Sequence, residues 1–349
     1  MEVALYEFSN EITKGKTLKM NAITLMLGAA FLWSLYPAII ALSGAQIGAP
    51  LFVILIHISS GLSASLFAFL SIKQKAAVWH NLKFYTKSLQ FEDWLYLFLI
   101  GILSTLFNFC FVVAMDSTSK VGTAVIIEAW PLIAMLLAPY LITKAWKKVH
   151  FTDYITGFIA LMGVGLIMVG DQMDISMMFT DFSAYVQTDD YNSIVGIIIA
   201  LIGSVCLALS IVLGGQISNK ISKIVLQEDE YTVTCAYIGE AVRRIVALLP
   251  SLLLLFAFKD EWNISYEGVG LAIFSGVFIF NIGAIAITLA LLKSPSSTIN
   301  MLYYISPVMA VGWLYLIGMA DMTVMILFGG ALVILANLLV LGKNKKVKP

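Results

Sequence analysis

The chain has 349 residues, of which 60% are hydrophobic and only 12% are charged. Soluble globular proteins carry roughly a quarter charged residues, so this composition, with a mean hydropathy of +0.94, excludes that class. The formal net charge of zero and the pI near 6.8 give no indication of nucleic-acid binding.

The first apolar stretch follows a polar segment, 1–19, which we expect to be cytoplasmic. That stretch is too long for a signal peptide and lacks an evident cleavage site. Because a helix needs roughly 20 apolar residues to span the hydrocarbon core, the sequence predicts an all-α membrane protein with ten transmembrane helices. Their predicted ranges are 20–42, 49–72, 94–115, 119–142, 153–169, 193–216, 232–258, 268–292, 296–318 and 322–341.

The lysines are divided unevenly between the two sides that this helix count creates. With the N-terminus inside, the inner segments hold 17 lysines and the outer segments hold only Lys120 and Lys259. Cytoplasmic loops of membrane proteins are enriched in Lys and Arg. The pattern therefore predicts ten helices with both termini in the cytosol.

The longest outer loop contains five aspartates and no lysine or arginine, and it divides the chain into two halves of five helices. The halves align, because Ala114 to Pro131 spans the same distance as Ala290 to Pro307. Since five is an odd number, the halves must enter the membrane from opposite sides. Such inverted repeats are typical of secondary transporters, whose sites lie at mid-membrane, often at broken helices. The predicted domains are 1–19, a first five-helix repeat 20–170, an acidic external loop 171–192, a second repeat 193–342 and a basic cytoplasmic tail 343–349.

Each half contains an apolar helix that a proline interrupts. In the first half Glu128, Trp130 and Pro131 lie close together in one apolar run. A charge at mid-membrane is costly, and proline removes a helical hydrogen bond and frees a carbonyl group. The corresponding residues of the second half are Tyr303, Tyr304 and Pro307. We predict that a substrate-binding site is built on these two interrupted helices.

Glu128 is the strongest single candidate in this site. Counting inward from Ser119 at ~1.5 Å per residue places it ~14 Å deep, near the centre of a ~30 Å core. A carboxylate there could bind a substrate ammonium group or carry a proton in a proton-coupled cycle, because desolvation favours its neutral form. The alternative is a structural partner for Arg243 or Arg244.

Aromatic and amide side chains at similar depth extend the predicted site. Trp33 and Tyr36 lie one turn apart in the first helix, and Asn300 lies one turn before Tyr303. Buried amides and phenols need hydrogen-bond partners, which a polar solute could supply. Hydrogen bonding between helices is the alternative for these residues, and packing is the alternative for the aromatic ones. Two further mid-membrane amides are Asn108 and Asn281.

The seventh predicted helix carries three charged residues. Glu240, Arg243 and Arg244 are spaced i, i+3 and i+4, so they can neutralise one another, and we expect them to have a structural or secondary role. His57 in the second helix is a candidate proton carrier, with a hydrogen-bonded structural histidine as the alternative.

Three sequence patterns of this chain resemble those of a known protein family. They are the Trp33-Ser34 step, the Ala114…Ser117…Ser119…Ala124…Pro131 pattern repeated as Ala290…Ser294…Ser297…Pro307, and a glycine-rich closing helix in each half. On these residues the chain resembles the EamA-type members of the drug/metabolite transporter superfamily from 20 to 341, and among them the bacterial amino-acid exporters. It departs from them at 143–146, where the family often has a glutamate after the proline.

The resemblance implies a secondary active transporter of the bacterial cytoplasmic membrane that exports amino acids or related metabolites. Its partners would be a small solute and the lipid bilayer, and a homodimer is one open oligomeric state. No HExxH, GxSxG or Walker A pattern is present, so we expect neither an enzyme nor a P-loop ATPase. Three dispersed cysteines and three histidines give no reason to expect a metal or cofactor. A non-transporting receptor or scaffold is the alternative, followed by an intramembrane enzyme.

Overall fold

The structure, a computed structural model, describes residues 21–74, 90–127, 130, 133–134, 137, 151–172, 191–225, 232–259, 261–293, 299, 302–303 and 305–344. These residues are predominantly helical and include no strand. By length and composition, five helical stretches could cross a membrane. They are Ala22–Gly44, Ala49–Leu70, Phe91–Ser117, Ile194–Gly214 and Tyr266–Ala290. The prediction of an all-α membrane protein is therefore confirmed at the level of fold class.

Where the structure describes them, the helices of the first half lie within a few residues of the predicted ranges, with one added break. They are α2 (Ala22–Ser34), α3 (Tyr36–Ile47), α4 (Ala49–Gln74), α6 (Phe91–Ser117), α7 (Lys120–Ile127) and α9 (Phe151–Gln172). The first predicted helix is divided at Leu35, since Pro37 occupies the first turn of α3 and cannot donate a helical hydrogen bond. Gly48 separates α3 from α4 with a φ of 76°, a conformation that favours glycine.

The helices of the second half differ more from expectation. They are α12 (Tyr191–Val225), α13 (Thr232–Ala257), α14 (Tyr266–Phe274), η3 (Ser275–Gly283), α15 (Ala284–Lys293), α17 (Ile305–Leu316) and α18 (Val324–Asn344). The eighth predicted helix is continuous in space but contains the π-helical segment η3, which the hydropathy pattern did not indicate. Helix α12 has 35 residues and continues beyond the predicted end at Gln216.

Helical residues occur in every one of the ten predicted ranges. Besides the break at Leu35, the turn at Tyr303 and the π-helical winding of η3, the differences lie at the ends of the described helices. Asp171 belongs to α9 and Tyr191 to α12, so helices take residues from both ends of the loop predicted at 171–192. Lys343 belongs to α18 rather than to the predicted tail. Polar residues at a helix end can remain helical outside the apolar core, which is why hydropathy alone does not locate these boundaries.

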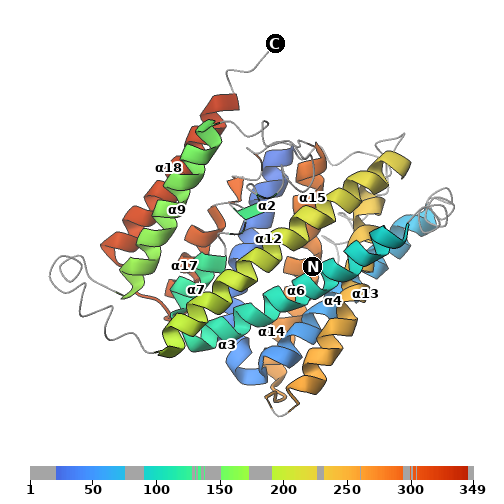
Figure 1. Cartoon of the computed structure of the whole chain (residues 1–349), viewed down its shortest axis with the longest axis horizontal. Helices are drawn as coiled ribbons and strands as arrows, with labels where there is room; N and C mark the ends of the chain where they lie inside the picture. The colour runs from blue at the N-terminus through green and yellow to red at the C-terminus, as the bar shows by residue number, and fades with distance from the viewer. Residues whose placement is uncertain are drawn as a thin grey trace.

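The helices pack in pairs that join the two halves. Helix α4 packs against α13, and α9 packs against α18, as Figure 1 shows along one edge of the molecule. Helix α2 packs against α15 and α17 of the second half, while α12 packs against α6 and α7 of the first half. The first helix of each half therefore lies on the third and fourth helices of the other.

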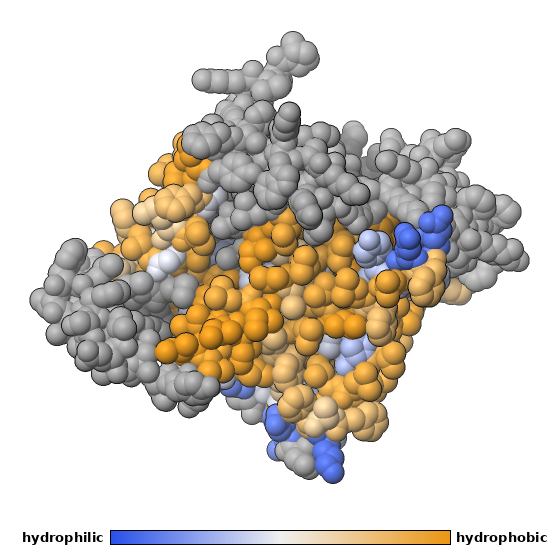
Figure 2. Space-filling view, in the orientation of Figure 1, coloured by the Kyte–Doolittle hydropathy of each residue, from blue (hydrophilic) through white to orange (hydrophobic). Residues whose placement is uncertain are grey.

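Close packing of α9 on α18 depends on two glycines. A Cβ atom on Gly163 would lie 2.6 Å from the carbonyl oxygen of Gly329, so neither position has room for a side chain. The outward surface of the bundle is apolar, with exposed residues such as Phe158, Leu201 and Phe328. Figure 2 shows apolar residues over most of the described part of one face, across α6 and α12. Such a surface suits a lipid environment.

Candidate functional site

One residue from each of the two predicted interruptions lies in a contact inside the bundle. Trp130 and Tyr303 are in edge contact, with ring centroids 4.9 Å apart, and their exposed fractions are 3% and 1%. The described part of α7 stops at Ile127, and the next described residue, Trp130, is helical as well, whereas Tyr303 lies in a turn just before α17, which begins at Ile305. The contact joins residues 173 positions apart in sequence, counted from 130 to 303, and it brings together the two regions from which the site was predicted.

Pro307 lies near the start of α17. It is the third residue of α17, and the first four N–H groups of a helix have no intrahelical acceptor, so the missing proline donor costs little there. The turn before it is closed by the Ser306 amide, which donates to the Tyr303 carbonyl at 2.8 Å. Four other predicted site residues lie outside the described residues. They are Glu128, Pro131, Asn300 and Tyr304.

Two buried polar groups near this contact have no hydrogen-bond partner among the described residues. They are the indole Nε1 of Trp130, which can only donate, and the hydroxyl of Ser306. Buried polar groups normally have partners, since an unmade hydrogen bond costs about 1–3 kcal/mol. A third polar group, the Ser204 hydroxyl of α12, donates to the Ile127 carbonyl of α7 at 3.2 Å.

An aromatic cluster fills the space between α2, α3, α4, α6 and η3. Its six members, all buried, are Trp33, Tyr36, Phe52, Phe107, Phe111 and Phe280. Tyr36 is central, with its ring centroid 4.9 Å from that of Phe280 and 5.3 Å from that of Phe111. Trp33 and Tyr36 thus share one cluster, as their spacing predicted, and they belong to the same hydrophobic core as Trp130 and Tyr303.

Asn108 connects the aromatic cluster to α6. Its Oδ1 accepts a 2.5 Å hydrogen bond from the Tyr36 hydroxyl, and its Nδ2 donates to the Ser104 carbonyl at 2.8 Å. Both ends of the amide are therefore occupied by the protein. In this conformation Asn108 links α3 to α6. This corresponds to hydrogen bonding between helices, which the sequence analysis gave as the alternative to solute binding.

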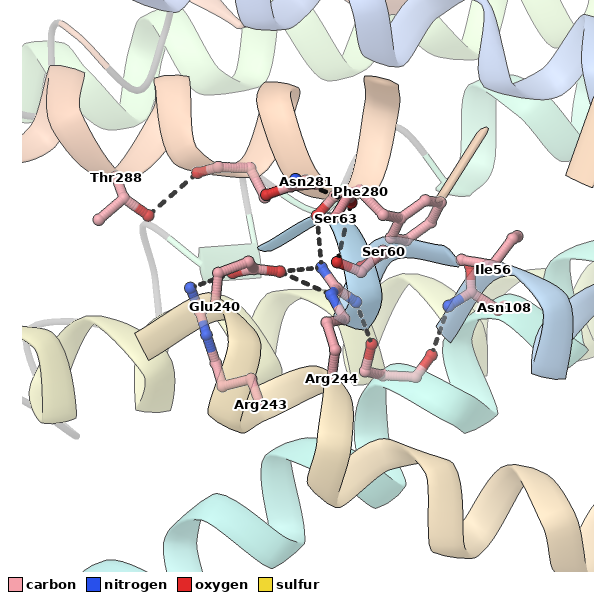
Figure 3. A network of polar contacts seen from close by, with 12 residues as sticks. Ile56, Ser60, Ser63, Asn108, Glu240, Arg243, Arg244, Phe280, Asn281 and Thr288 are labelled. Atoms are coloured by element: carbon pink, nitrogen blue, oxygen red, sulfur yellow. Dashed lines mark hydrogen bonds and ion pairs between the residues drawn. The ribbon is translucent and has the colours of Figure 1, made fainter. Parts of the chain in front are cut away.

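The three charged residues of α13 form ion pairs, as their spacing allows, with Glu240 and Arg244 buried and Arg243 partly buried. Glu240 accepts from both Arg243 and Arg244, so the two arginines share one carboxylate. The group has one more positive than negative charge and lies in an apolar bundle, where an unpaired charge is costly. Figure 3 shows the Arg244 guanidinium between Glu240 on one side and Phe280 on the other.

Arg244 reaches beyond its own helix. It donates to the Ser104 hydroxyl at 3.2 Å and to the Phe280 carbonyl at 3.0 Å, and its Cζ lies 5.1 Å from the centroid of the Phe280 ring. Sequence reasoning assigned the charges to this region but missed Ser104 and Phe280. The one signal available for Ser104 was its position four residues before Asn108 on an apolar helix.

Asn281 contacts α4 and is only partly satisfied. Its Nδ2 donates to the Ser63 hydroxyl at 2.9 Å, whereas its Oδ1 has no partner among the described residues. The hydroxyls of Ser60 and Ser275 are also buried without a hydrogen-bond partner among the described residues. The interface is close, because a Cβ atom on Gly276 would meet atoms of Ser59 and Ser60. The α4–η3 interface therefore offers hydrogen-bonding groups that the described part of the protein does not use.

His57 lies in a separate polar group at the α4–α6–α13 junction. Its Nε2 is 3.5 Å from the Thr105 hydroxyl, which is itself 3.2 Å from the Ser251 hydroxyl. The His57 Nδ1 has no partner among the described residues. The same described residues include no group of three His, Cys, Asp or Glu side chains that could hold a metal ion.

Comparison with known proteins identifies a fold but no family. No family model and no curated protein matches the sequence. A solved structure described only as "Crystal structure of protein" aligns with a TM-score of 0.66 and 13% sequence identity, over 94% of this chain and 99% of that chain. The chain therefore shares its all-α fold with a protein of known structure along nearly the whole length of both.

Proposed function

We propose that the protein is a secondary active transporter that exports amino acids or related small metabolites by alternating access. The observation that carries this proposal is the buried contact between Trp130 and Tyr303, beside the Trp130 indole and the Ser306 hydroxyl, which have no partner among the described residues. An irregular helix start in the core of an apolar bundle, such as the turn at Tyr303 before α17, is where transporters often place their substrate sites. A polar solute there would supply the acceptor that the Trp130 indole needs.

The packing of the helices supports the proposed architecture of ten spans in two inverted five-helix repeats. Each half supplies the same kinds of partner to the other, with α4 on α13, α9 on α18, and each first helix on the opposite third and fourth helices. An inverted duplication gives this exchange of partners, because a two-fold axis in the membrane plane relates the repeats. Rocking of one repeat against the other would expose the central site to each side in turn.

The lysine distribution supports cytoplasmic termini, and with the resemblance to exporters it favours the bacterial cytoplasmic membrane. In this scheme Glu128 binds a substrate ammonium group or carries the coupled proton, and His57 is a second candidate for the proton. Arg243 and Arg244 already share the Glu240 carboxylate, which supports a role for Glu128 other than pairing with them.

Transport is tested with purified protein in liposomes that carry a pH gradient. We expect the protein to move at least one solute from an amino-acid and metabolite panel, selected first by its thermal stabilisation of the protein. Formation of a chemical product without solute movement would show instead that the protein is an enzyme. If no solute moves in either direction, the transporter proposal is wrong.

The site is tested with Glu128→Gln and Trp130→Phe in the same liposomes. We expect Glu128→Gln to abolish transport or remove its pH dependence while the protein stays folded. Trp130→Phe keeps a ring against Tyr303 but removes the indole donor, so we expect a KM increase of about tenfold with little loss of stability. Transport that is unchanged in both variants would place the substrate site elsewhere.

A further inference from the structure

Segment η3 is unusual both in its winding and in its contacts. It runs for nine residues, Ser275–Gly283, whereas π-helices mostly occur as single-turn bulges. At its end the Ala284 amide is directed to the carbonyls of Ile279 and Asn281, and the Phe280 carbonyl between them accepts from Arg244. A side chain of another helix thus holds the acceptor that a regular α-helix would offer to the Ala284 amide.

Arg244 is well suited to hold this carbonyl. Its Nε donates to Glu240 on α13 and its Nη1 donates to the Ser104 hydroxyl on α6. Because the guanidinium is rigid and planar, these two contacts direct its Nη2 toward the Phe280 carbonyl of η3. A hydrogen bond from a charged donor is stronger than one between neutral groups, and burial strengthens it further. Gly61 of α4 leaves room for Arg244, since a Cβ at that position would lie 3.3 Å from the Arg244 Cβ.

The residue whose carbonyl is held also contributes its ring to the aromatic cluster. The Phe280 ring centroid lies 4.9 Å from those of both Trp33 and Tyr36. The contacts close a loop, because Tyr36 bonds Asn108, Asn108 bonds the Ser104 carbonyl, and the Ser104 hydroxyl bonds Arg244. Figure 3 shows Arg244, Asn108 and Phe280 close together in this network of polar contacts. The winding of η3 and the closure of the aromatic cluster therefore depend on the same guanidinium.

We propose that Arg244 is a positioning residue that keeps Ser275–Gly283 π-helical and so holds Phe280 against Trp33 and Tyr36. When Arg244 releases the Phe280 carbonyl, that carbonyl becomes available to the Ala284 amide and the segment returns to α-helical winding. This change rotates Phe280 about the helix axis and opens the aromatic cluster. The opening of the aromatic cluster would act as a gate for solute, and this part of the proposal rests on the transport function proposed above. The hydrogen bond from Arg244 to the Phe280 carbonyl, which we call the tether, does not depend on that function.

Arg243 and Phe280 allow matched variants. Arg243→Gln removes a cation that shares Glu240, but no hydrogen bond joins Arg243 to η3 among the described residues. Phe280→Leu removes the ring from the aromatic cluster and keeps the backbone carbonyl that Arg244 holds. Comparison of Arg244→Gln with these two variants separates loss of the tether from loss of charge and from loss of the ring.

The tether is tested by amide hydrogen exchange of the full chain in lipid nanodiscs. In Arg244→Gln we expect the peptide over 275–285 to exchange at least about tenfold faster, while Arg243→Gln and Phe280→Leu change it by less than about twofold. Arg244→Lys should restore part of the protection, because the ammonium can reach one acceptor but not three. Equal exchange in Arg244→Gln and Arg243→Gln would overturn the proposal.

Two further measurements keep the test decisive. If Arg244→Gln does not fold, Ser104→Ala removes one anchor of the guanidinium, and exchange over 275–285 should rise about threefold; no rise would overturn the tether. If the protein moves solute, Phe280→Leu should change the maximal rate more than KM, and an unchanged rate would overturn the gate. If no solute moves in any variant, the proposed function fails, while the exchange data still decide the tether.

Discussion

Helix α6 and the segment α14–η3–α15 occupy the third place in their respective halves, yet they are wound differently. Helix α6 is α-helical over all of its 27 residues, whereas its counterpart contains nine π-helical residues. Both are strongly apolar, and both contact the same guanidinium, α6 through the Ser104 side chain and η3 through a backbone carbonyl. The comparison indicates that hydropathy sets the length of a buried helix, while a polar contact from another helix can set its winding.

The two helices also differ in how they satisfy a buried asparagine. Asn108 of α6 uses both ends of its amide, while Asn281 of η3 uses only its Nδ2 among the described residues. A satisfied amide fixes its neighbours, and a partly satisfied one leaves an acceptor for water or a solute. We therefore expect α6 to be the rigid member of the pair and η3 to be the adaptable one.

Removal of the shared carboxylate should have the largest effect on both helices. Glu240→Gln leaves the buried Arg244 and the partly buried Arg243 without their counter-ion, so we expect the free energy of unfolding to fall by about 3–5 kcal/mol. SDS titration in mixed micelles measures this change. The exposed Asp321→Asn is a control that should stay within about 0.5 kcal/mol of the parent protein. Similar values for the two variants would mean that the ion pairs do not organise the bundle.

A methyl group at the α4–η3 interface should affect only the π-helical member. The Cβ of Gly276→Ala would lie 2.7 Å from the Ile56 carbonyl oxygen, a backbone atom that cannot easily move. We expect a loss of about 3 kcal/mol, measured by the same titration. Gly270→Ala is the matched control, since its Cβ meets no atom within 4 Å, and it should be neutral or slightly stabilising. Equal effects would show that α4 and η3 are loosely packed.

Truncation of Asn108, the fully hydrogen-bonded amide, should lower the free energy of unfolding by less than either change above. Asn108→Ala leaves the Tyr36 hydroxyl without its acceptor and removes the bond to the Ser104 carbonyl, so we expect a loss of about 2 kcal/mol. Tyr36→Phe in the same background should recover part of this loss, because it removes the unpaired hydroxyl. A double variant no more stable than Asn108→Ala would argue against the buried hydrogen bond.

Truncation of the partly satisfied amide should have the smallest effect. Asn281→Ala removes one hydrogen bond to Ser63 and also an acceptor that has no partner among the described residues, so we expect a loss of about 1 kcal/mol. The same variant should weaken binding of any solute that uses the free acceptor, which a thermal-shift titration measures. A cost equal to that of Asn108→Ala would remove the distinction between the two helices.

Several features of the site could be predicted from local sequence. The spacing of Glu240, Arg243 and Arg244 was sufficient to expect their ion pairs, because i,i+3 and i,i+4 side chains always adjoin on a helix. The shared environment of Trp33 and Tyr36 followed from the same rule. The contact of Trp130 with Tyr303 needed the additional inference of an internal duplication, since nothing local to either residue indicates the other.

Other features could not be predicted in this way. Ser104 and Phe280 are ordinary residues of apolar helices, and they acquire their roles only because α6, α13 and η3 converge on Arg244. The break at Leu35 had a local signal in Pro37, but Pro250 lies within α13 without ending it, so proline alone does not decide where a helix stops. The roles of Ser104 and Phe280 thus depend on which helices meet at Arg244, and local sequence does not record that.

The sequence by itself determined that this protein is helical and apolar enough for a membrane, because the hydrocarbon core requires long apolar helices whose backbone is satisfied internally. It also determined which polar residues are costly to bury. Only the tertiary structure decided how those costs are met. Glu240 serves two arginines, Asn108 holds Tyr36, and the Phe280 carbonyl turns from its own helix to Arg244. Buried hydrogen bonds are made between helices distant in sequence, and hydropathy does not record those distances.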